Sequence, residues 1–276
     1  MKLATRRDGD IEIHRVKNPY CEAEFTVFGG HIMQWQPEQQ KPVLWQSKNA
    51  AMNGSTAIRG GIPLCWPWFG EIPERGKHGL VRTALWTLDT VEQLSDGTCV
   101  KLFLEIPDTV NPWGYPSRCE QVIHFGASLK QTLTISNNAS DSQYSFAFHN
   151  YFAIGALEHV ELPFTRHVDY HDKILQCDIA AHDKPIEFDT PIDRIYHSAE
   201  DALLLDHKWR RRIHIKKSHC PSTVVWNPAG DAKNIKDIHA GGEQEYVCVE
   251  SAAASPVKIA ANAVNTHSQT IVVESF

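Results

Sequence analysis

The chain has 276 residues, of which 42% are hydrophobic, and its formal net charge at pH 7 is −6. This length and hydrophobic fraction suffice for a large core, and we expect one domain over residues 1–276. The acidic balance argues against nucleic acid as a partner, so any anion site must be a local basic pocket.

Seven cysteines occur at wide spacings without a Cys-x-x-Cys pair. They indicate buried, reduced thiols and exclude a zinc ribbon or a thioredoxin-type motif. The first residues lack the apolar stretch of a signal peptide, and no run approaches the roughly 18 apolar residues of a membrane span. We therefore expect a cytoplasmic protein that does not contact a membrane. A monomer is also expected, although no sequence pattern specifies the oligomeric state.

Short extended segments bounded by turn residues dominate the pattern. They cover residues 20–28, 31–36, 41–45, 86–91, 99–106, 121–125, 129–136, 145–151, 203–205, 212–216, 222–226, 246–250 and 270–273. Turns are expected at 96–97, within a hairpin, and at 137–141, and a short helical turn within 229–238. This pattern predicts an all-β fold, a large antiparallel β-sandwich with few short helices.

Residues 58–70 form an unusual apolar segment. Pro63 and Pro67 exclude a regular helix and make a central strand improbable, yet six large apolar residues favour burial. A buried irregular segment must still satisfy its main-chain polar groups, which points to a functional use. Arg59 precedes two glycines, where the main chain can approach a ligand closely.

Further cations follow this segment at Lys77, His78 and Arg82. Taken singly, an arginine beside glycines is typical of a solvated turn, and a Trp-Pro-Trp run is typical of a core. Together with an aromatic floor from Trp66 and Trp68, the cations predict a pocket for an anionic sugar or another small polar anion.

His149 lies in the apolar run 146–152. Strand alternation places it on the same face as Ala147 and Tyr151, opposite the large phenylalanines. One interpretation of this position is a purely structural histidine, buried in the core with both ring nitrogens hydrogen-bonded. The other is a histidine that faces a cleft and takes part in catalysis, because a desolvated imidazole is suited to proton transfer.

Glu250 ends the apolar segment 246–250 and shares a face with Tyr246 and Cys248. The carboxylate lies either at the rim of the sheet or in a polar pocket, since carboxylates are rarely buried without a partner. The sequence contains no Walker A loop, strand-linked G-x-G-x-x-G or H-E-x-x-H motif, so we expect neither a cofactor nor a metal.

Several motifs resemble those of the glucose-6-phosphate 1-epimerase (hexose-6-phosphate mutarotase) family of the aldose 1-epimerase superfamily. They are Arg59-Gly-Gly-Ile-Pro, Trp66-Pro-Trp-Phe-Gly, His78-Gly-Leu-Val-Arg82, Phe148-His-Asn-Tyr-Phe152, residues 190–196 and Val247-Cys-Val-Glu250. The resemblance implies a galactose mutarotase-like supersandwich. It also implies interconversion of the α and β anomers of D-hexose 6-phosphates, with a small sugar phosphate as partner and without a cofactor.

The same resemblance implies roles for individual residues. His149 would protonate the ring oxygen, Glu250 would be the base at the anomeric hydroxyl, and Asp193 would bind sugar hydroxyls. The family's phosphate and sugar contacts carry over onto Arg59, Lys77 and Arg82, with His78 beside the sugar. Lys77 departs from some members, which have glutamine there, and Trp66 replaces a small residue or phenylalanine.

Alternative functions stay open at this level. They are an epimerase of unphosphorylated aldoses, an epimerase of another anionic sugar, and a sugar-phosphate-binding protein without activity. The histidines between Glu158 and Lys184 fit no metal-ligand spacing and are expected on loops. The run Arg210–Arg212 is expected to be solvated.

Overall fold

The computed structural model describes residues 2–114, 116–137 and 140–276. An N-terminal four-stranded sheet has the order β1-β2-β3-β4. Its strands are β1 (Ala4–Asp8), β2 (Ile11–Asn18), β3 (Cys21–Thr26) and β4 (His31–Pro37). Every strand pair among the described residues is antiparallel, which is the pattern of sheets joined by short turns.

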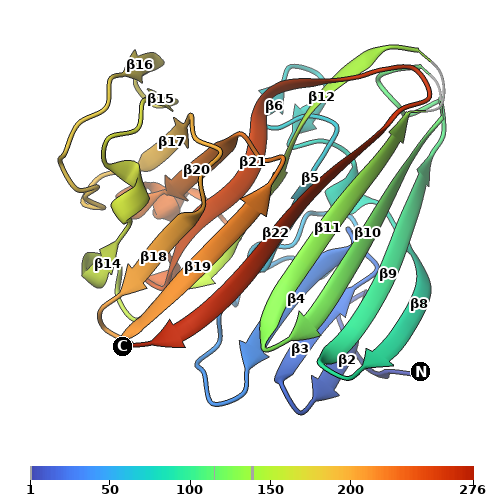
Figure 1. Cartoon of the computed structure of the whole chain (residues 1–276), viewed down its shortest axis with the longest axis horizontal. Helices are drawn as coiled ribbons and strands as arrows, with labels where there is room; N and C mark the ends of the chain where they lie inside the picture. Colours follow the sequence, from blue (N-terminus) through green and yellow to red (C-terminus); the bar gives the residue numbers. More distant parts are fainter. Residues whose placement is uncertain (1, 115, 138–139) are drawn as a thin grey trace.

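The first eight-stranded sheet has the order β14-β18-β19-β22-β11-β10-β9-β8 and lies in front in Figure 1. Its strands are β8 (Thr87–Leu94), β9 (Gly97–Ile106), β10 (Ser117–Gly126), β11 (Ser128–Asn137), β14 (Val160–Glu161), β18 (Ala202–Asp206), β19 (Arg211–Ser218) and β22 (Val264–Ser275).

The second large sheet lies behind the first and has the order β16-β15-β17-β20-β21-β12-β5, with β13 also paired to β21 (Figure 1). Its strands are β5 (Leu64–Cys65), β12 (Ser142–Phe148), β13 (Tyr151–Ala153), β15 (Tyr170–Asp172), β16 (Cys177–Ile179), β17 (Ile192–Tyr196), β20 (Ser222–Asn227) and β21 (Tyr246–Ile259). The remaining elements are a small hairpin and five 3-10 helices: β6 (Glu71–Ile72), β7 (Gly76–Lys77), η1 (Val81–Thr83), η2 (Leu157–His159), η3 (Pro163–Thr165), η4 (Ala229–Asn234) and η5 (Gly242–Gln244).

The core lies between these sheets. One cluster of buried side chains extends in sequence from Val16 to Ile271 and includes residues of the four-stranded sheet and of both eight-stranded sheets. In β11 the buried residues Leu129, Leu133 and Ile135 alternate with partly exposed ones, which is the pattern of a strand with one face on a core. The predicted all-β sandwich is therefore confirmed.

Most predicted strands are present, but the predicted strand 145–151 is divided into β12 and β13, and two further segments differ. The β8–β9 hairpin turns at residues 95–96, one position before the predicted turn. Residues 41–45 do not form a strand, because this segment makes only isolated bridges, Leu44 to Phe152 and, just beyond it, Gln46 to Gly60. Residues 138 and 139 of the predicted turn lie outside the described residues.

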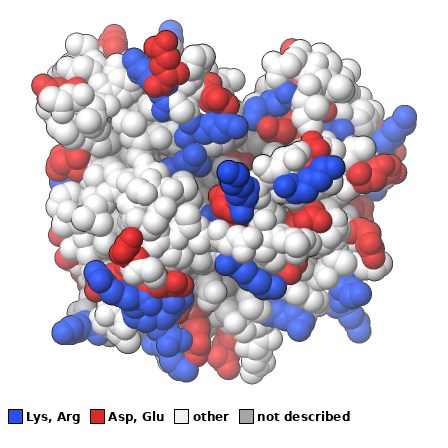
Figure 2. Space-filling model, turned by 180° about the vertical axis from the view of Figure 1, so that it is seen from behind, with Lys and Arg blue, Asp and Glu red and all other residues white. Residues whose placement is uncertain are grey.

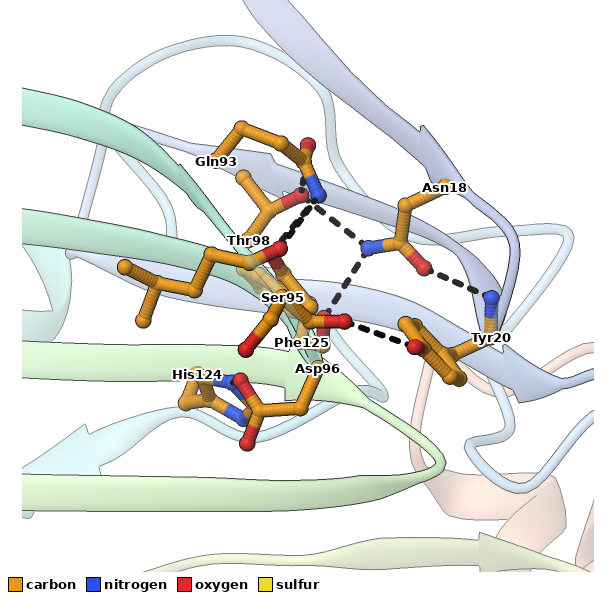
Figure 3. A network of polar contacts seen from close by, with 10 residues as sticks. Asn18, Tyr20, Gln93, Ser95, Asp96, Thr98, His124 and Phe125 are labelled. Carbon is orange, nitrogen blue, oxygen red and sulfur yellow. Dashed lines mark hydrogen bonds and ion pairs between the residues drawn. The ribbon is translucent and has the colours of Figure 1, made fainter.

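A polar network ties the N-terminal sheet to the first eight-stranded sheet (Figure 3). The Asn18 side chain donates to Thr98 Oγ1 and to the carbonyl of Phe125, both at 3.0 Å. The Tyr20 hydroxyl donates to the carbonyl of Ser95 at 2.6 Å. These bonds fix the β2–β3 turn against the β8–β9 hairpin.

Arg211 contradicts the expectation that the arginine run is solvated. It is buried at the start of β19, with Nε 3.5 Å from the buried carboxylate of Asp206. Its guanidinium also donates to the carbonyls of Lys41, Pro42 and Ala153. The prediction failed because these partners come from distant segments.

All seven cysteines are described and carry free thiols, five of them buried. Within the described part of the chain, no helix has the length and apolar character needed to cross a membrane.

Candidate active site

A cavity of about 450 Å³ opens over strands β17, β20 and β21 of the second large sheet, and all seven predicted site residues line it. Figure 2 shows the face of the molecule behind the view of Figure 1, where this sheet lies; the face is hollowed, and Lys and Arg side chains gather around the hollow. The predicted lining residues are Arg59, Lys77, His78, Arg82, His149, Asp193 and Glu250, and Phe69, Gly70, Glu71, Lys173, Trp226 and Ile235 complete it.

His149 and Glu250 face each other across an interruption in the sheet. β12 ends at Phe148 and β13 begins at Tyr151, and both strands pair with β21 in a register that places His149 opposite Glu250. His149 Nε2 lies 3.4 Å from Glu250 Oε1, and both side chains are buried. Neither His149 Nδ1 nor Glu250 Oε2 has a hydrogen-bond partner among the described residues. Both atoms belong to residues that line the cavity, so a polar ligand bound there is one way to satisfy them.

The surroundings of His149 oppose a positive charge. Burial lowers its pKa well below the ordinary value of 6.5, and the nearby His78, Arg59 and Arg82 lower it further. The imidazole is therefore neutral in the free protein near pH 7.

Glu250 is affected in the opposite sense. Burial raises the pKa of its carboxyl group well above 4.5, with a further contribution from Asp193, while Lys173 and Arg82 act against this rise. A neutral imidazole thus stands beside a carboxyl group whose protonated form is favoured by burial, and the two groups titrate as a coupled pair.

Arg59 is held firmly at the side of this pair. Its guanidinium makes two hydrogen bonds to Asp237, at 3.1 and 3.2 Å, and one to the Tyr151 hydroxyl at 2.8 Å. The Tyr151 ring stacks on His149 with a centroid distance of 4.8 Å. Tyr151 was expected on this face, whereas nothing in the sequence pattern singles out Asp237.

The glycines after Arg59 allow close packing against neighbouring main chain and not the expected close approach of a ligand. A Cβ atom on Gly60 would lie 2.4 Å from the main chain of Gln46, and one on Gly61 would lie 2.2 Å from the carbonyl oxygen of Ile32. Both glycines also adopt positive φ angles. They therefore allow the segment to pack closely on neighbouring main chain.

The expected aromatic floor of Trp66 and Trp68 is wrong. Trp66 belongs to the main core and makes an edge contact with Trp113, while Trp68 Nε1 bonds to the carbonyl of Gly76. The rings that line the cavity are those of Phe69 and Trp226. Trp226 lies on β20, some 160 residues away in sequence, so no local pattern could indicate it.

The remaining polar groups form two pairs. Lys77 is exposed, with Nζ 3.3 Å from Glu71, and its carbonyl accepts a hydrogen bond from Arg82 at 3.0 Å. Lys173 Nζ lies 2.7 Å from Asp193 Oδ2. The sequence did not predict Lys173 as a site residue, because it lies in the His- and Asp-rich segment that was expected to form loops.

His78 sits between these pairs, 5.5 Å from His149 by ring centroids. Burial, with Arg82 and Lys173 nearby, lowers its pKa to about 3, so the ring is neutral and can exchange hydrogen bonds with a polar ligand.

The sequence is similar to a known protein family and to several curated proteins. The profile described as "Aldose 1-epimerase" matches residues 12–274. This chain belongs to the aldose 1-epimerase family. An Escherichia coli K12 protein named "Putative glucose-6-phosphate 1-epimerase" is 29% identical over 265 residues, covering 92% of this chain and 87% of its own length. A Cenchrus ciliaris protein of the same name is 28% identical over 249 residues, covering 84% and 75%.

A solved structure described as a "putative mutarotase" from Salmonella typhimurium shares the fold of this family member. It superposes with a TM-score of 0.92 at 25% identity, covering 99% of this chain and 94% of the other. Among the described residues of this aldose 1-epimerase family member, no group of three or more His, Cys, Asp or Glu side chains is placed to hold a metal ion.

Proposed function

We propose that the chain interconverts the α and β anomers of D-hexose 6-phosphates, glucose 6-phosphate foremost, by general acid–base ring opening. The observation that carries the proposal is the close approach of His149 Nε2 and Glu250 Oε1 inside a cavity lined by two arginines and two lysines. The names of the relatives and the motif resemblance support the same substrate class.

Ring opening uses both side chains at once. Glu250, as carboxylate, takes the proton of the anomeric hydroxyl while His149, as imidazolium, gives its proton to the ring oxygen. The bond between C1 and the ring oxygen breaks and leaves an aldehyde. After rotation about the C1–C2 bond, His149 removes the proton from the C5 hydroxyl as its oxygen attacks the other face of the aldehyde. Glu250 then returns its proton to the former carbonyl oxygen, and the pair is restored.

The directions of the two pKa shifts suit this cycle. Burial favours a neutral imidazole and a protonated carboxyl group, which are the forms that follow ring opening. The imidazolium and carboxylate forms differ only by the transfer of one proton between two atoms 3.4 Å apart. No proton exchange with solvent is needed during a turnover.

The charges of the cavity fit a sugar phosphate. Four cationic side chains line it, in a chain whose net charge is −6. Arg59, Lys77 and Lys173 are each paired with a carboxylate, whereas Arg82 is not, in the part of the chain that the structure describes. Arg82 donates to the Lys77 carbonyl, and its other donors have no hydrogen-bond partner among the described residues. A planar guanidinium with unused donors is the group that binds phosphate oxygens in pairs.

Arg82→Ala should raise KM for glucose 6-phosphate by about tenfold to a hundredfold, the effect of losing a hydrogen bond to a charged group. Turnover of unphosphorylated glucose should change little, if glucose is a substrate. Arg59→Ala is the matched comparison. It should impair both sugars, because Arg59 holds Tyr151 against His149. Equal losses on both sugars in Arg82→Ala would remove Arg82 from the phosphate site.

The proposal is tested by following pure α-glucose 6-phosphate toward anomeric equilibrium by NMR exchange, with and without protein. α-Glucose is run in parallel, and each spontaneous rate is subtracted. Acceleration of the phosphate alone is expected. Acceleration of both sugars would favour a general aldose epimerase. Saturable binding without acceleration would make the chain a sugar-phosphate-binding protein.

An acid and a base this close together also predict a bell-shaped pH dependence of kcat/KM. At low pH both His149 and Glu250 are protonated and no base remains, and at high pH neither holds a proton and no acid remains. Because burial lowers the pKa of His149, the acid limb should lie well below pH 6.5. The second ionisation of the substrate phosphate, near pH 6, is followed separately by its phosphorus resonance. An acid limb at the ordinary histidine value, after this correction, would contradict the assignment.

A further inference from the structure

Each of the two residues at the interruption of the sheet lies opposite one residue of β21. The register that places His149 opposite Glu250 also places Asn150 opposite Val249. His149 and Asn150 belong to no strand, and the main-chain N–H of Asn150 turns back to the carbonyl of Phe148 at 3.0 Å. The ladder therefore lacks its regular bonds at the point where the two reactive side chains meet.

The side chain of Asn150 bridges this gap. Its Nδ2 donates to the carbonyl of Val249 at 2.9 Å, and both residues are fully buried. The residue after His149 is thus tied by its amide to the residue before Glu250. This one bond joins the two chain segments that carry the acid–base pair.

A chain of buried glutamines braces Asn150 from the opposite sheet. Asn150 and Gln269 exchange two hydrogen bonds, at 2.9 and 2.8 Å. Gln269 donates onward to Gln131, Gln131 to Gln121, and Gln121 to the carbonyl of Gly30. Each of these glutamines is at most 1% exposed. This row of glutamines runs across β22, β11 and β10 of the first eight-stranded sheet and ends at the turn that precedes β4.

Such a chain is not what stability alone favours. Leaving a buried amide unpaired costs about 1–3 kcal/mol, whereas apolar groups of the same shape in place of both partners can be neutral or stabilising. A row of amides that all satisfy one another does, however, fix a unique geometry. One end of this row lies at the interruption that carries His149, opposite Glu250.

We propose that Asn150 is a positioning residue, whose amide, braced through Gln269 by the buried glutamines, holds His149 against Glu250 at the interrupted ladder. This inference rests on the proposed acid–base function. Asn150 acts through the main chain on each side of the pair and does not touch the sugar.

The test compares Asn150→Ala with Asn137→Ala in the exchange assay, alongside unfolding by urea. Asn137 is a matched buried amide that donates to the carbonyls of Ser140 and Ala260, just beyond the far end of β21. That end lies ~30 Å along the strand from Glu250. Asn150→Ala should lower kcat by about tenfold to a hundredfold, the effect of a misplaced reactive group, while KM stays near its original value. Asn137→Ala should lose stability and keep kcat.

Gln269→Leu is the second variant, because it retains the Asn150–Val249 bond and removes only the brace. It should lower kcat by about threefold to tenfold, again with KM unchanged. If Asn150→Ala does not fold, the test rests on Gln269→Leu. A Gln269→Leu protein with the kcat of the unsubstituted protein would then overturn the inference. A folded Asn150→Ala protein with original kcat, or with the same loss as Asn137→Ala, would also overturn it. Absence of activity in the unsubstituted protein would instead refute the proposed function.

Discussion

Replacing His149 by alanine, or Glu250 by glutamine, should lower kcat for glucose 6-phosphate by about 10²–10⁴, the usual contribution of one acid–base group. Each variant removes one end of the proton exchange between Nε2 and Oε1, so ring opening loses either its acid or its base. Substrate binding should persist, since the cations of the cavity are unchanged. Saturation transfer between the α and β anomeric resonances measures the rate.

The control for this pair is His267→Asn. His267 is also buried, but it lies in the core between the Tyr144 hydroxyl and the carbonyl of His219. Its replacement should lower stability and leave kcat unchanged. A His149→Ala protein that binds substrate and turns over at the original rate would exclude His149 from the reaction, and the corresponding result for Glu250→Gln would exclude the carboxyl group.

Arg211→Met should lower the free energy of unfolding by about 3–5 kcal/mol, the loss typical of a broken buried ion pair. The change leaves the carboxylate of Asp206 buried without its counter-ion and takes the donors from three main-chain carbonyls. Burial also lowers the pKa of Arg211 to about 10, although Asp206 acts in the opposite direction. Desolvation therefore disfavours the charged form, and the ion pair with Asp206 offsets part of that cost. Urea unfolding followed by tryptophan fluorescence measures the loss.

Two further variants test this explanation. Arg15→Met removes an exposed partner of Glu24 and should change stability by less than about 1 kcal/mol, because Arg6 still pairs with this carboxylate. The double variant Asp206→Asn, Arg211→Met should be more stable than Arg211→Met alone, because no unpaired charge is left behind. Equal losses for Arg15→Met and Arg211→Met would show that burial of the pair is irrelevant.

The strands and the two reactive residues could be predicted from the sequence because their signals are local. Alternation within 146–152 placed His149 on the face of Tyr151, and the structure stacks these two rings. The end of an apolar strand likewise made Glu250 a candidate. That these residues face each other depends on the register of β12 and β13 on β21, which local patterns do not specify.

The partners of these residues come from elsewhere in the chain. Lys173 and Asp237 lie in loops, and each pairs with a residue 20 or more positions away. Trp66 shows the converse error, since its neighbours in sequence suggested a ligand floor while its volume fills the core. Contacts that form only through the tertiary fold override what composition alone suggests.

His149 and Glu250 are about a hundred positions apart in the chain, yet they meet across adjacent strands. Closing so long a loop precedes any contact between them, and folds built on such distant pairings are slow to form. Turnover is therefore a reporter of complete folding. During refolding, the return of activity should coincide with the last step in which tryptophan fluorescence changes, and partly assembled sheets should be inactive.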